Sequence, residues 1–275
     1  MISPTYRAPL QPDALEDDID LIEYPESDGQ PMTESDPTRD YLIYSVEVLR
    51  QFFQSRSDVY VSGNLFIYYQ QGSRQAVVSP DVFVIFGVAN RQRRSYKLWE
   101  ENYRVRSFIL EITSRTTWEI DEVEKPARYA QLGVQEYFQY DPTGDYLTPP
   151  LKGRTLVEGQ YRSLTPEIFS DGQLCFHSQT LKLDLRLTAG VLRFYIPATW
   201  ERLLTYQEAE QARQQAEQAR QEAEQARQEA EQARQEAEQA RLDAVPRLAV
   251  MGLSAEQIAE VLGLPIATIL SLLGQ

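Results

Sequence analysis

The segment Phe108-Ile109-Leu110-Glu111-Ile112-Thr113 is a short apolar run with one charged residue inside it. A run of this length, rich in large and β-branched side chains, is typical of a buried strand. Apolar residues then follow at helical spacing over residues 123–132, and Gly133 suits the left-handed residue that ends a helix. The next run, Glu136-Tyr137-Phe138-Gln139-Tyr140, is closed by Asp141-Pro142 and predicts another strand. The centre of the chain is therefore expected to run strand, helix, strand.

Upstream of this segment, the chain predicts one helix and up to three strands. A helix is expected over residues 37–54, where apolar residues fall at helical spacing behind residues suited to a cap. Residues 59–69 are rich in aromatic and β-branched side chains around Gly63, which predicts one bent strand or two short ones. Residues 76–86 read as a strand that Pro80 interrupts. Further short strands are expected downstream, at residues 155–157, 174–176, 181–185 and 191–196.

The charge of the 275-residue chain, −14 in total, is unevenly distributed. Residues 1–40 have a net charge of −9, residues 41–207 have +1, residues 208–242 have −4 and residues 243–275 have −2. Net charge is informative for each segment separately. The near-neutral middle of the chain is therefore compatible with a nucleic-acid substrate, bound weakly and in a salt-sensitive way.

Residues 1–35 predict a flexible acidic arm, because five prolines and many acids leave too little apolar surface to offset the entropy cost of ordering. The start of the chain lacks the basic and apolar regions of a signal peptide, and no stretch approaches about 18 uncharged apolar residues. Its single cysteine, Cys175, cannot form an intrachain disulfide. We therefore expect a cytoplasmic protein with no membrane segment.

From residue 206 to residue 242 the chain is a helix-forming repeat, Glu-Ala-Glu-Gln-Ala-Arg-Gln, written five times with small changes. Alanines recur at alternating spacings of three and four, the pattern of a coiled-coil seam. An alanine seam buries little area, so two interpretations stay open: a homo-oligomer formed through residues 208–242, or a solvated helical spacer.

The last segment, residues 243–275, predicts a small helix-turn-helix tail. Ser254 suits the cap of a helix with Gln257 at its third position, Gly263 suits its end, and a second helix is expected near Pro265. The second helix contains no lysine or arginine. A packing or pairing role is therefore favoured over DNA recognition by this tail.

Two acids, Asp81 and Glu111, interrupt otherwise apolar strands. A charge in a core strand is costly unless it is paired or bound to a metal. If their strands are neighbours, the two carboxylates can meet and offer the hard oxygen ligands that Mg²⁺ or Mn²⁺ prefers. The alternative is that each acid lies at a strand end and faces water.

Lys125 lies in the helix that follows the Glu111 strand. If this helix packs over the sheet, the ammonium group can orient an attacking water and stabilise charge that develops on phosphorus. The alternative is an ordinary pair with Asp121, four residues earlier on the same helix.

This order of motifs resembles the Uma2 family of restriction-endonuclease-like proteins, a branch of the PD-(D/E)XK nuclease superfamily. The resemblance rests on Pro80-Asp81, on residues 110–114, on Lys125, and on residues 129–142, which run from Tyr129-Ala130-Gln131-Leu132-Gly133 to Asp141-Pro142. It covers about residues 24–205. The resemblance implies an α/β (α+β) domain over residues 36–205, with a mixed central sheet flanked by helices, followed by the long C-terminal helix and the small helical tail.

The resemblance also implies a site. Asp81, Glu111 and the backbone carbonyl of Ile112 would be metal ligands, and Lys125 would be the displaced catalytic lysine, because Thr113 stands where the superfamily usually has lysine. Two positions depart from the family pattern: Asn64 stands where many relatives have an acid, and Arg39 stands where others often have histidine.

The leading hypothesis is a Mg²⁺-dependent endonuclease that hydrolyses DNA phosphodiesters, with RNA a weaker candidate substrate. A basic cluster is expected to contact the nucleic-acid backbone, with Arg39 as a further contact: Arg91, Arg93, Arg94, Arg104 and Arg106. The rival hypothesis is a non-catalytic nuclease scaffold that assembles through its C-terminal helix. His177 is assigned a structural or surface role, and Cys175 that of a small buried hydrophobe.

Overall fold

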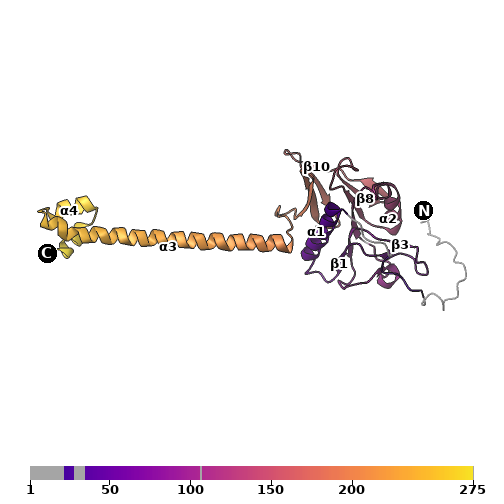
Figure 1. Ribbon diagram of the computed structural model, residues 1–275, viewed down its shortest axis with the longest axis horizontal. Coiled ribbons are helices and arrows are strands. Elements are labelled where there is room, and N and C mark those ends of the chain that lie inside the picture. The colour runs from indigo at the N-terminus through magenta and orange to yellow at the C-terminus, as the bar shows by residue number, and fades with distance from the viewer. Residues whose placement is uncertain (1–21, 28–34, 106, 275) are drawn as a thin grey trace, which may run out of the picture. The chain divides into compact units, whose positions relative to one another are not determined.

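The computed structural model describes residues 22–27, 35–105 and 107–274 of the chain. The chain divides into two compact units, residues 1–205 and residues 206–275 (Figure 1). The first unit holds the strands and the acids of the predicted site, and the second consists of helices.

The centre of the first unit is a six-stranded mixed sheet in the order β1-β4-β6-β7-β8-β9. Strands β6 and β7 are parallel, and every other neighbouring pair is antiparallel. The parallel pair needs a crossover connection, which the helical segment between the two strands supplies. The strands are β1 (Val59–Ser62), β4 (Val82–Phe86), β6 (Ser107–Ile112), β7 (Glu136–Tyr140), β8 (Leu151–Val157) and β9 (Gln160–Ser163).

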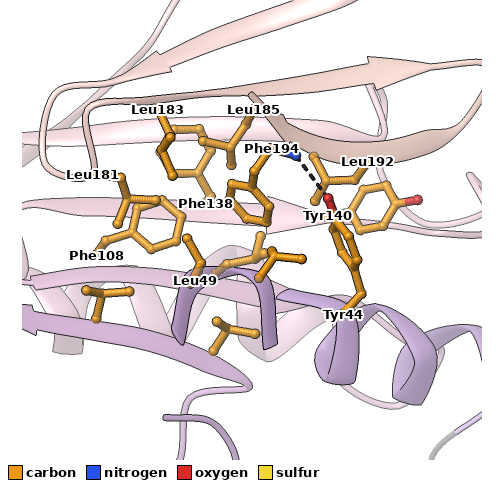
Figure 2. Close-up of a cluster of buried hydrophobic side chains, with 14 of the residues drawn as sticks. Tyr44, Leu49, Phe108, Phe138, Tyr140, Leu181, Leu183, Leu185, Leu192 and Phe194 are labelled. Atoms are coloured by element: carbon orange, nitrogen blue, oxygen red, sulfur yellow. Dashed lines mark hydrogen bonds between the residues drawn. The ribbon is translucent and has the colours of Figure 1, made fainter. Parts of the chain in front are cut away.

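Helix α1 (Asp36–Phe52) and a four-stranded sheet cover one face of the central sheet. Figure 2 shows their shared core, in which Tyr44 and Leu49 of α1 meet Phe138 of β7 and Phe194 of the smaller sheet. The Tyr44 Oη atom accepts a hydrogen bond from the backbone N–H of Phe194, at 3.2 Å. The smaller sheet has the order β10 (Glu167–Ile168), β11 (Leu174–Ser178), β12 (Leu183–Thr188) and β13 (Val191–Tyr195).

The opposite face of the central sheet is covered by a second core of aromatic and aliphatic side chains. These come from the three-stranded sheet β3-β2-β5, from η2 (Leu98–Glu101) and from α2 (Lys125–Leu132). The three short strands are β2 (Ile67–Tyr68), β3 (Val77–Val78) and β5 (Tyr96–Lys97). Helix α2 is preceded by a wider π-helical turn, η3 (Ile120–Glu124).

Part of the predicted acidic arm lies against the second covering layer. Tyr68 Oη donates to the Pro25 carbonyl at 2.7 Å, and the Tyr24 hydroxyl accepts from Gly72 N at 2.7 Å. The Tyr24 ring also contacts Trp99, with centroids 5.1 Å apart. Residues 22–27 are thus held by specific contacts, unlike the flexible chain expected there, and residues 1–21 and 28–34 lie outside the described residues.

The expected mixed central sheet flanked by helices is confirmed, and so is the long C-terminal helix. The strands at residues 59–69 and 76–86 are each split into two short strands that enter different sheets, around Gly63 and around Pro80. Three short strands that the sequence pattern did not indicate are β5, β9 and β10. Each has two to four residues, too few to show a period.

The second unit consists of α3 (Tyr206–Val250), α4 (Ala255–Leu262) and α5 (Ile266–Leu272). A capping box at Ser254 begins α4 and a left-handed Gly263 ends it, as predicted. The three helices share a small core of Val245, Ile258 and Ile269. Among the described residues, no single helix has the length and apolarity to cross a membrane; α4 and α5 pass that test only together, as a pair bent by 119°.

Candidate active site

The pairing of β4 with β6 brings Asp81 and Glu111 together. Val82 pairs with Leu110 in the antiparallel register, so the residues just outside this pair, Asp81 and Glu111, lie side by side. The Asp81 backbone N–H donates to Glu111 Oε2 at 3.3 Å, and the Ile112 N–H donates to Asp81 Oδ2 at 2.8 Å. The two acids therefore meet where their strands pair, rather than each facing water at a separate strand end.

Gly63 makes this arrangement sterically feasible. A Cβ atom at position 63 would lie 2.3 Å from the Asp81 carbonyl oxygen and 2.9 Å from a methyl group of Val46. Because backbone cannot yield as a flexible side chain does, the chain needs a glycine where the end of β1 crosses beside Asp81. The next residue, Asn64, has a positive φ of 47° and donates its N–H to the Pro80 carbonyl at 3.0 Å.

Lys125 joins Glu111 to a third buried acid, Asp121. Its Nζ lies 2.9 Å from Glu111 Oε2 and 2.7 Å from Asp121 Oδ1. Glu111 and Asp121 are fully buried, whereas the Lys125 side chain is 23% exposed. Both alternatives for Lys125 are thus combined, because it reaches the sheet site while it also pairs with Asp121.

Helix geometry explains the placement of Asp121, Lys125 and Tyr129. Residues four apart lie on the same helix face, and these three are spaced by four across η3 and α2. The Tyr129 hydroxyl donates to Glu111 Oε1 at 2.6 Å, so Tyr129 and Lys125 hold the two oxygens of one carboxylate. The Tyr137 hydroxyl of β7 donates to the Asp121 carbonyl at 2.7 Å and ties the π-helical turn to the sheet.

The buried charges perturb one another. Burial, and then the negative charge of Glu111, raise the pKa of Asp81 well above its usual range, against the effect of Lys125. The same two causes raise the pKa of Asp121. Burial alone lowers the pKa of Lys125, but Glu111, Asp121 and Asp81 raise it more, so the ammonium group stays protonated.

The donor set fits a divalent cation in its chemistry. Asp81, Glu111 and Asp121 are three acids against one lysine, and burial, followed by the negative charge of Glu111, raises the pKa values of Asp81 and Asp121. Carboxylate and carbonyl oxygens are the ligands that Mg²⁺ and Mn²⁺ prefer. Within the described ranges, no group of three or more His, Cys, Asp or Glu side chains is arranged as a complete metal site. The predicted ligand set has only two carboxylate side chains, because its third ligand is the backbone carbonyl of Ile112.

A pocket of about 200 Å³ opens beside this cluster. Lys125 and Tyr129 line one side of it, so the polar groups that hold Glu111 border the pocket. The remaining lining comes from β3, η3 and α2, in the form of Val77, Val78, Ser79, Ile120, Glu124 and Arg128.

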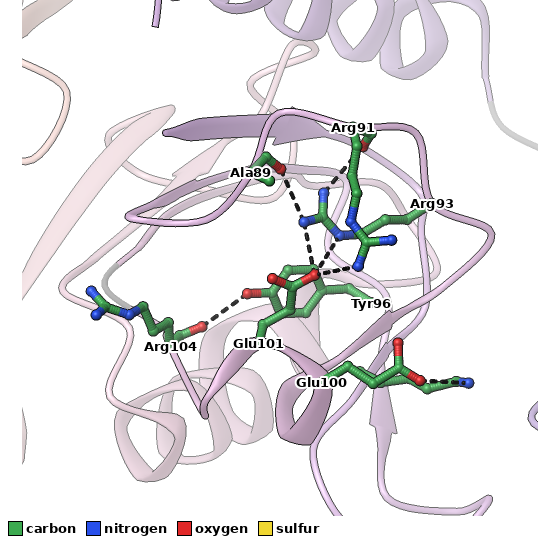
Figure 3. A network of polar contacts seen from close by, with 8 residues as sticks. Ala89, Arg91, Arg93, Tyr96, Glu100, Glu101 and Arg104 are labelled. Carbon is green, nitrogen blue, oxygen red and sulfur yellow. Dashed lines mark hydrogen bonds and ion pairs between the residues drawn. The ribbon is translucent and has the colours of Figure 1, made fainter. Parts of the chain in front are cut away.

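The arginine-rich loop between β4 and β6 is organised around Glu101, as Figure 3 shows. Glu101 accepts from Arg91 at 2.9 Å and from Arg93 at 2.8 Å. The side chain of Arg93 is 4% exposed, and its guanidinium lies 4.2 Å from the centre of the Tyr60 ring. Burial alone raises the pKa of Glu101, but the hydrogen bonds from Arg93 and Arg91 together lower it more. Arg93 therefore holds the loop together, and Arg91 keeps a side chain 58% exposed.

The other predicted backbone contacts are scattered. Arg39 pairs with Asp36 at 2.6 Å on the surface of α1, and Arg94 pairs with Glu26 at 2.5 Å. Arg104 borders a separate groove at the opposite end of the central sheet from Asp81. Arg106 lies outside the described residues.

The two residues set aside in the sequence, His177 and Cys175, lie on β11. His177 Nδ1 lies 2.9 Å from Asp184 Oδ1, and the His177 side chain is 42% exposed. Cys175 is buried, and burial raises the pKa of its thiol to about 11. Both positions agree with the structural roles predicted for them.

Sequence reasoning missed the roles of Tyr129 and Gln139 and gave Asp121 only a pairing role. The spacing of four from Asp121 through Lys125 to Tyr129 was a usable signal for a common helix face. It did not show that this face lies over Glu111. Gln139 carried no sequence signal beyond a polar residue within a strand.

Replacing Tyr129 by phenylalanine is expected to lower the free energy of unfolding by about 2 kcal/mol, because it removes a hydrogen bond to a buried carboxylate. Urea denaturation of the metal-free protein measures the change. The matched control is Tyr161→Phe, which removes a hydroxyl bonded to the neutral Val134 carbonyl at 2.9 Å and is expected to cost about 1 kcal/mol. Equal losses in the two variants would contradict a charged acceptor at Glu111.

Comparison with known proteins places the chain in a family. A profile of the Uma2 family, described as "Putative restriction endonuclease", matches residues 12–190. Among solved structures, the chain is similar to "a putative nuclease belonging to DUF820 from Anabaena variabilis ATCC 29413", with 11% sequence identity and a TM-score of 0.36. That match covers 54% of this chain and 82% of the other. No curated protein matches the chain.

Proposed function

Because this chain belongs to the Uma2 family of restriction-endonuclease-type proteins, we propose that it is a Mg²⁺- or Mn²⁺-dependent endonuclease that hydrolyses DNA phosphodiester bonds. The observation that carries the proposal is the convergence of Asp81, Glu111 and Lys125 within hydrogen-bonding distance at one end of the sheet. Metal-assisted phosphodiester hydrolysis requires groups that hold a cation and groups that orient water. The two carboxylates suit the first task and the lysine suits the second.

Each residue has a specific part in this proposal. Asp81, Glu111 and the Ile112 carbonyl would hold the cation, which supplies Lewis-acid stabilisation and a lowered pKa for the attacking water. Lys125 would donate a hydrogen bond to that water and stabilise charge on the phosphoryl oxygens. Asp121 keeps the Lys125 ammonium charged and aimed at the site, and Tyr129 fixes the orientation of the Glu111 carboxylate.

The test is DNA cleavage by the purified full chain, with Mg²⁺ and again with excess chelator. Cleavage is expected only with the metal, and an RNA of the same sequence measures the preference for DNA. Absence of cleavage by wild type across supercoiled, linear and single-stranded DNA would overturn the proposal.

A second candidate function, assembly through the long helix, is favoured by a separate observation. All ten alanines of the repeat are exposed along α3 within its own unit. Ala209 and Ala212 take the a and d positions of the heptad. The e positions are then arginines, and four of the g positions are glutamates, at 208, 222, 229 and 236. In a parallel pair each g residue faces an e residue of the other helix, whereas an antiparallel pair would bring like charges together. We infer that the helix pairs with a second copy in parallel.

This pairing makes a prediction about charge. Replacing Arg227, Arg234 and Arg241 with glutamate is expected to weaken self-association about 100-fold, because six interhelical pairs of about 0.5 kcal/mol each are lost. Sedimentation equilibrium measures the change. A chain with arginine at 222, 229 and 236 should also fail to self-associate, yet the two variants should pair with each other. Unchanged self-association in both would contradict a parallel pair.

A further inference from the structure

A row of polar residues crosses the central sheet beside the catalytic cluster. Glu111 on β6 is in register with Gln139 on β7, and Gln139 is in register with Lys152 on β8. Residues in register across neighbouring strands project to the same face of a sheet. The row therefore continues from the acids toward the cation Lys152, on the face that α2 and η3 cover.

Glu122, in the π-helical turn η3, contacts the residues at the β8 end of the row. Its carboxylate lies 3.2 Å from Lys152 Nζ and 3.0 Å from a guanidinium nitrogen of Arg154, and it accepts from Gln139 Nε2 at 3.3 Å. Arg154 projects to the same face as Lys152, two residues along β8. The side chains of Glu122, Lys152 and Arg154 are 31%, 28% and 17% exposed, so a ligand can reach them.

The row contains a polar atom that nothing described satisfies. Gln139 is fully buried, and its Oε1 atom has no hydrogen-bond partner among the described residues. A buried polar atom without a partner costs about 1–3 kcal/mol. A ligand or water that donates to Gln139 Oε1 would remove this cost.

We propose that Lys152 and Arg154 bind a backbone phosphate of the nucleic acid next to the bond that is cleaved, and that Glu122 occupies the place of this phosphate until substrate binds. An inference of this kind rests on the endonuclease function proposed above. A carboxylate that bridges a lysine and an arginine offers the same charge-assisted contacts as a phosphate. The incoming phosphate displaces Glu122, and the Gln139 amide is then free to rotate toward the ligand water.

This assignment differs from the arginine loop predicted from sequence. Arg91 and Arg93 share Glu101, and no contact of either arginine with Asp81 or Glu111 is found among the described residues. Lys152, in contrast, is two register positions from Glu111 in the same row. Proximity to the acids therefore favours β8 as the source of the phosphate contacts.

The experiment measures binding and cleavage separately, on the full chain. Binding of a labelled DNA duplex is followed by fluorescence anisotropy in chelator, at several salt concentrations. Glu122→Gln is expected to bind about tenfold more tightly than wild type, because Lys152 and Arg154 lose their competing carboxylate. The double variant Lys152→Ala/Arg154→Ala is expected to bind about tenfold more weakly and to lose about two units of salt dependence.

Two controls keep the result interpretable. Lys182→Ala removes an exposed lysine between β11 and β12, whose Nζ donates to Gln179 Oε1 at 3.2 Å, and is expected to bind DNA like wild type. The isosteric Glu122→Gln guards against loss of folding in the alanine variants. If Glu122→Gln and the double variant both bind like wild type, the assignment is overturned. If wild type cleaves DNA and the double variant cleaves with unchanged KM, the phosphate site is also overturned while the endonuclease stands. If wild type does not cleave but the charge effects on binding are as expected, the phosphate site stands and the endonuclease falls.

Discussion

Replacing Lys125 with alanine is expected to lower the free energy of unfolding by about 3 kcal/mol at pH 7, because removing one partner of a buried ion pair leaves its carboxylates uncompensated. Lys125 is the described cation nearest to Glu111 and Asp121, at 2.9 Å and 2.7 Å, and both acids are fully buried. The expected loss of unfolding free energy is at the lower end of the usual range for a broken buried ion pair, because the lysine side chain is 23% exposed. Urea denaturation of the metal-free protein measures it.

The loss should depend on pH in a definite direction. The folded-state pKa of Asp121 is raised, mainly by burial and then by Glu111, and Lys125 opposes the rise. Removing the lysine raises that pKa further, so the variant binds protons more tightly in the folded state than the wild type does. A raised carboxyl pKa contributes stability that is complete below the unfolded pKa and is lost as pH rises through the folded pKa. The deficit of Lys125→Ala is therefore expected to shrink as pH falls from 7 toward 4.

The matched control is Lys97→Ala. Lys97 pairs with Glu100 at 3.1 Å, with side chains 27% and 48% exposed, and exposed pairs of this kind contribute less than about 1 kcal/mol. A deficit at Lys125 no larger than that at Lys97, or one that does not change with pH, would show that the lysine does not compensate Glu111 and Asp121.

The reason that Asp81, Glu111 and Lys125 could be predicted lies in local chemistry. An acid in an apolar strand is costly wherever its strand lies, so the sequence alone marks Asp81 and Glu111 as residues that need a partner. Their actual contact depends on the β4–β6 register, which pairs Val82 with Leu110. Register depends on the whole sheet and is not contained in either strand.

The parts that could not be predicted depend on contacts distant in sequence. Five of the six arginines predicted to contact DNA lie between residues 91 and 106, and the sixth, Arg39, lies on α1. A count of basic residues says nothing about their partners. Glu101 lies within the same loop and pairs with both Arg91 and Arg93. Gln139 and Lys152 become neighbours of Glu111 only when β7 and β8 join the sheet.

Replacing Asp81 with asparagine is expected to reduce DNA cleavage at least about 1000-fold and to raise the stability of the metal-free protein by about 1–2 kcal/mol. The loss of activity corresponds to about 4 kcal/mol of transition-state stabilisation from a metal site that loses one carboxylate. The gain in stability follows from electrostatics. Burial and Glu111 raise the pKa of Asp81, so at neutral pH its ionised form works against folding, and a neutral side chain removes that cost. The Ile112 N–H, which donates to Asp81 Oδ2 at 2.8 Å, keeps an acceptor in asparagine.

The two effects of Asp81→Asn have opposite signs, which separates a functional acid from a structural one. An acid kept for stability would lose both activity and stability on substitution, whereas a metal ligand should lose activity and gain stability without metal. Saturating Mg²⁺ should then stabilise wild type more than the variant, because only the wild type has the full ligand set. The control is Asp58→Asn: Asp58 pairs with Arg56 at 2.7 Å, which lowers its pKa, so this substitution should reduce stability slightly and leave cleavage unchanged. If Asp81→Asn is less stable than wild type without metal, or if Mg²⁺ stabilises both proteins equally, Asp81 does not hold the cation.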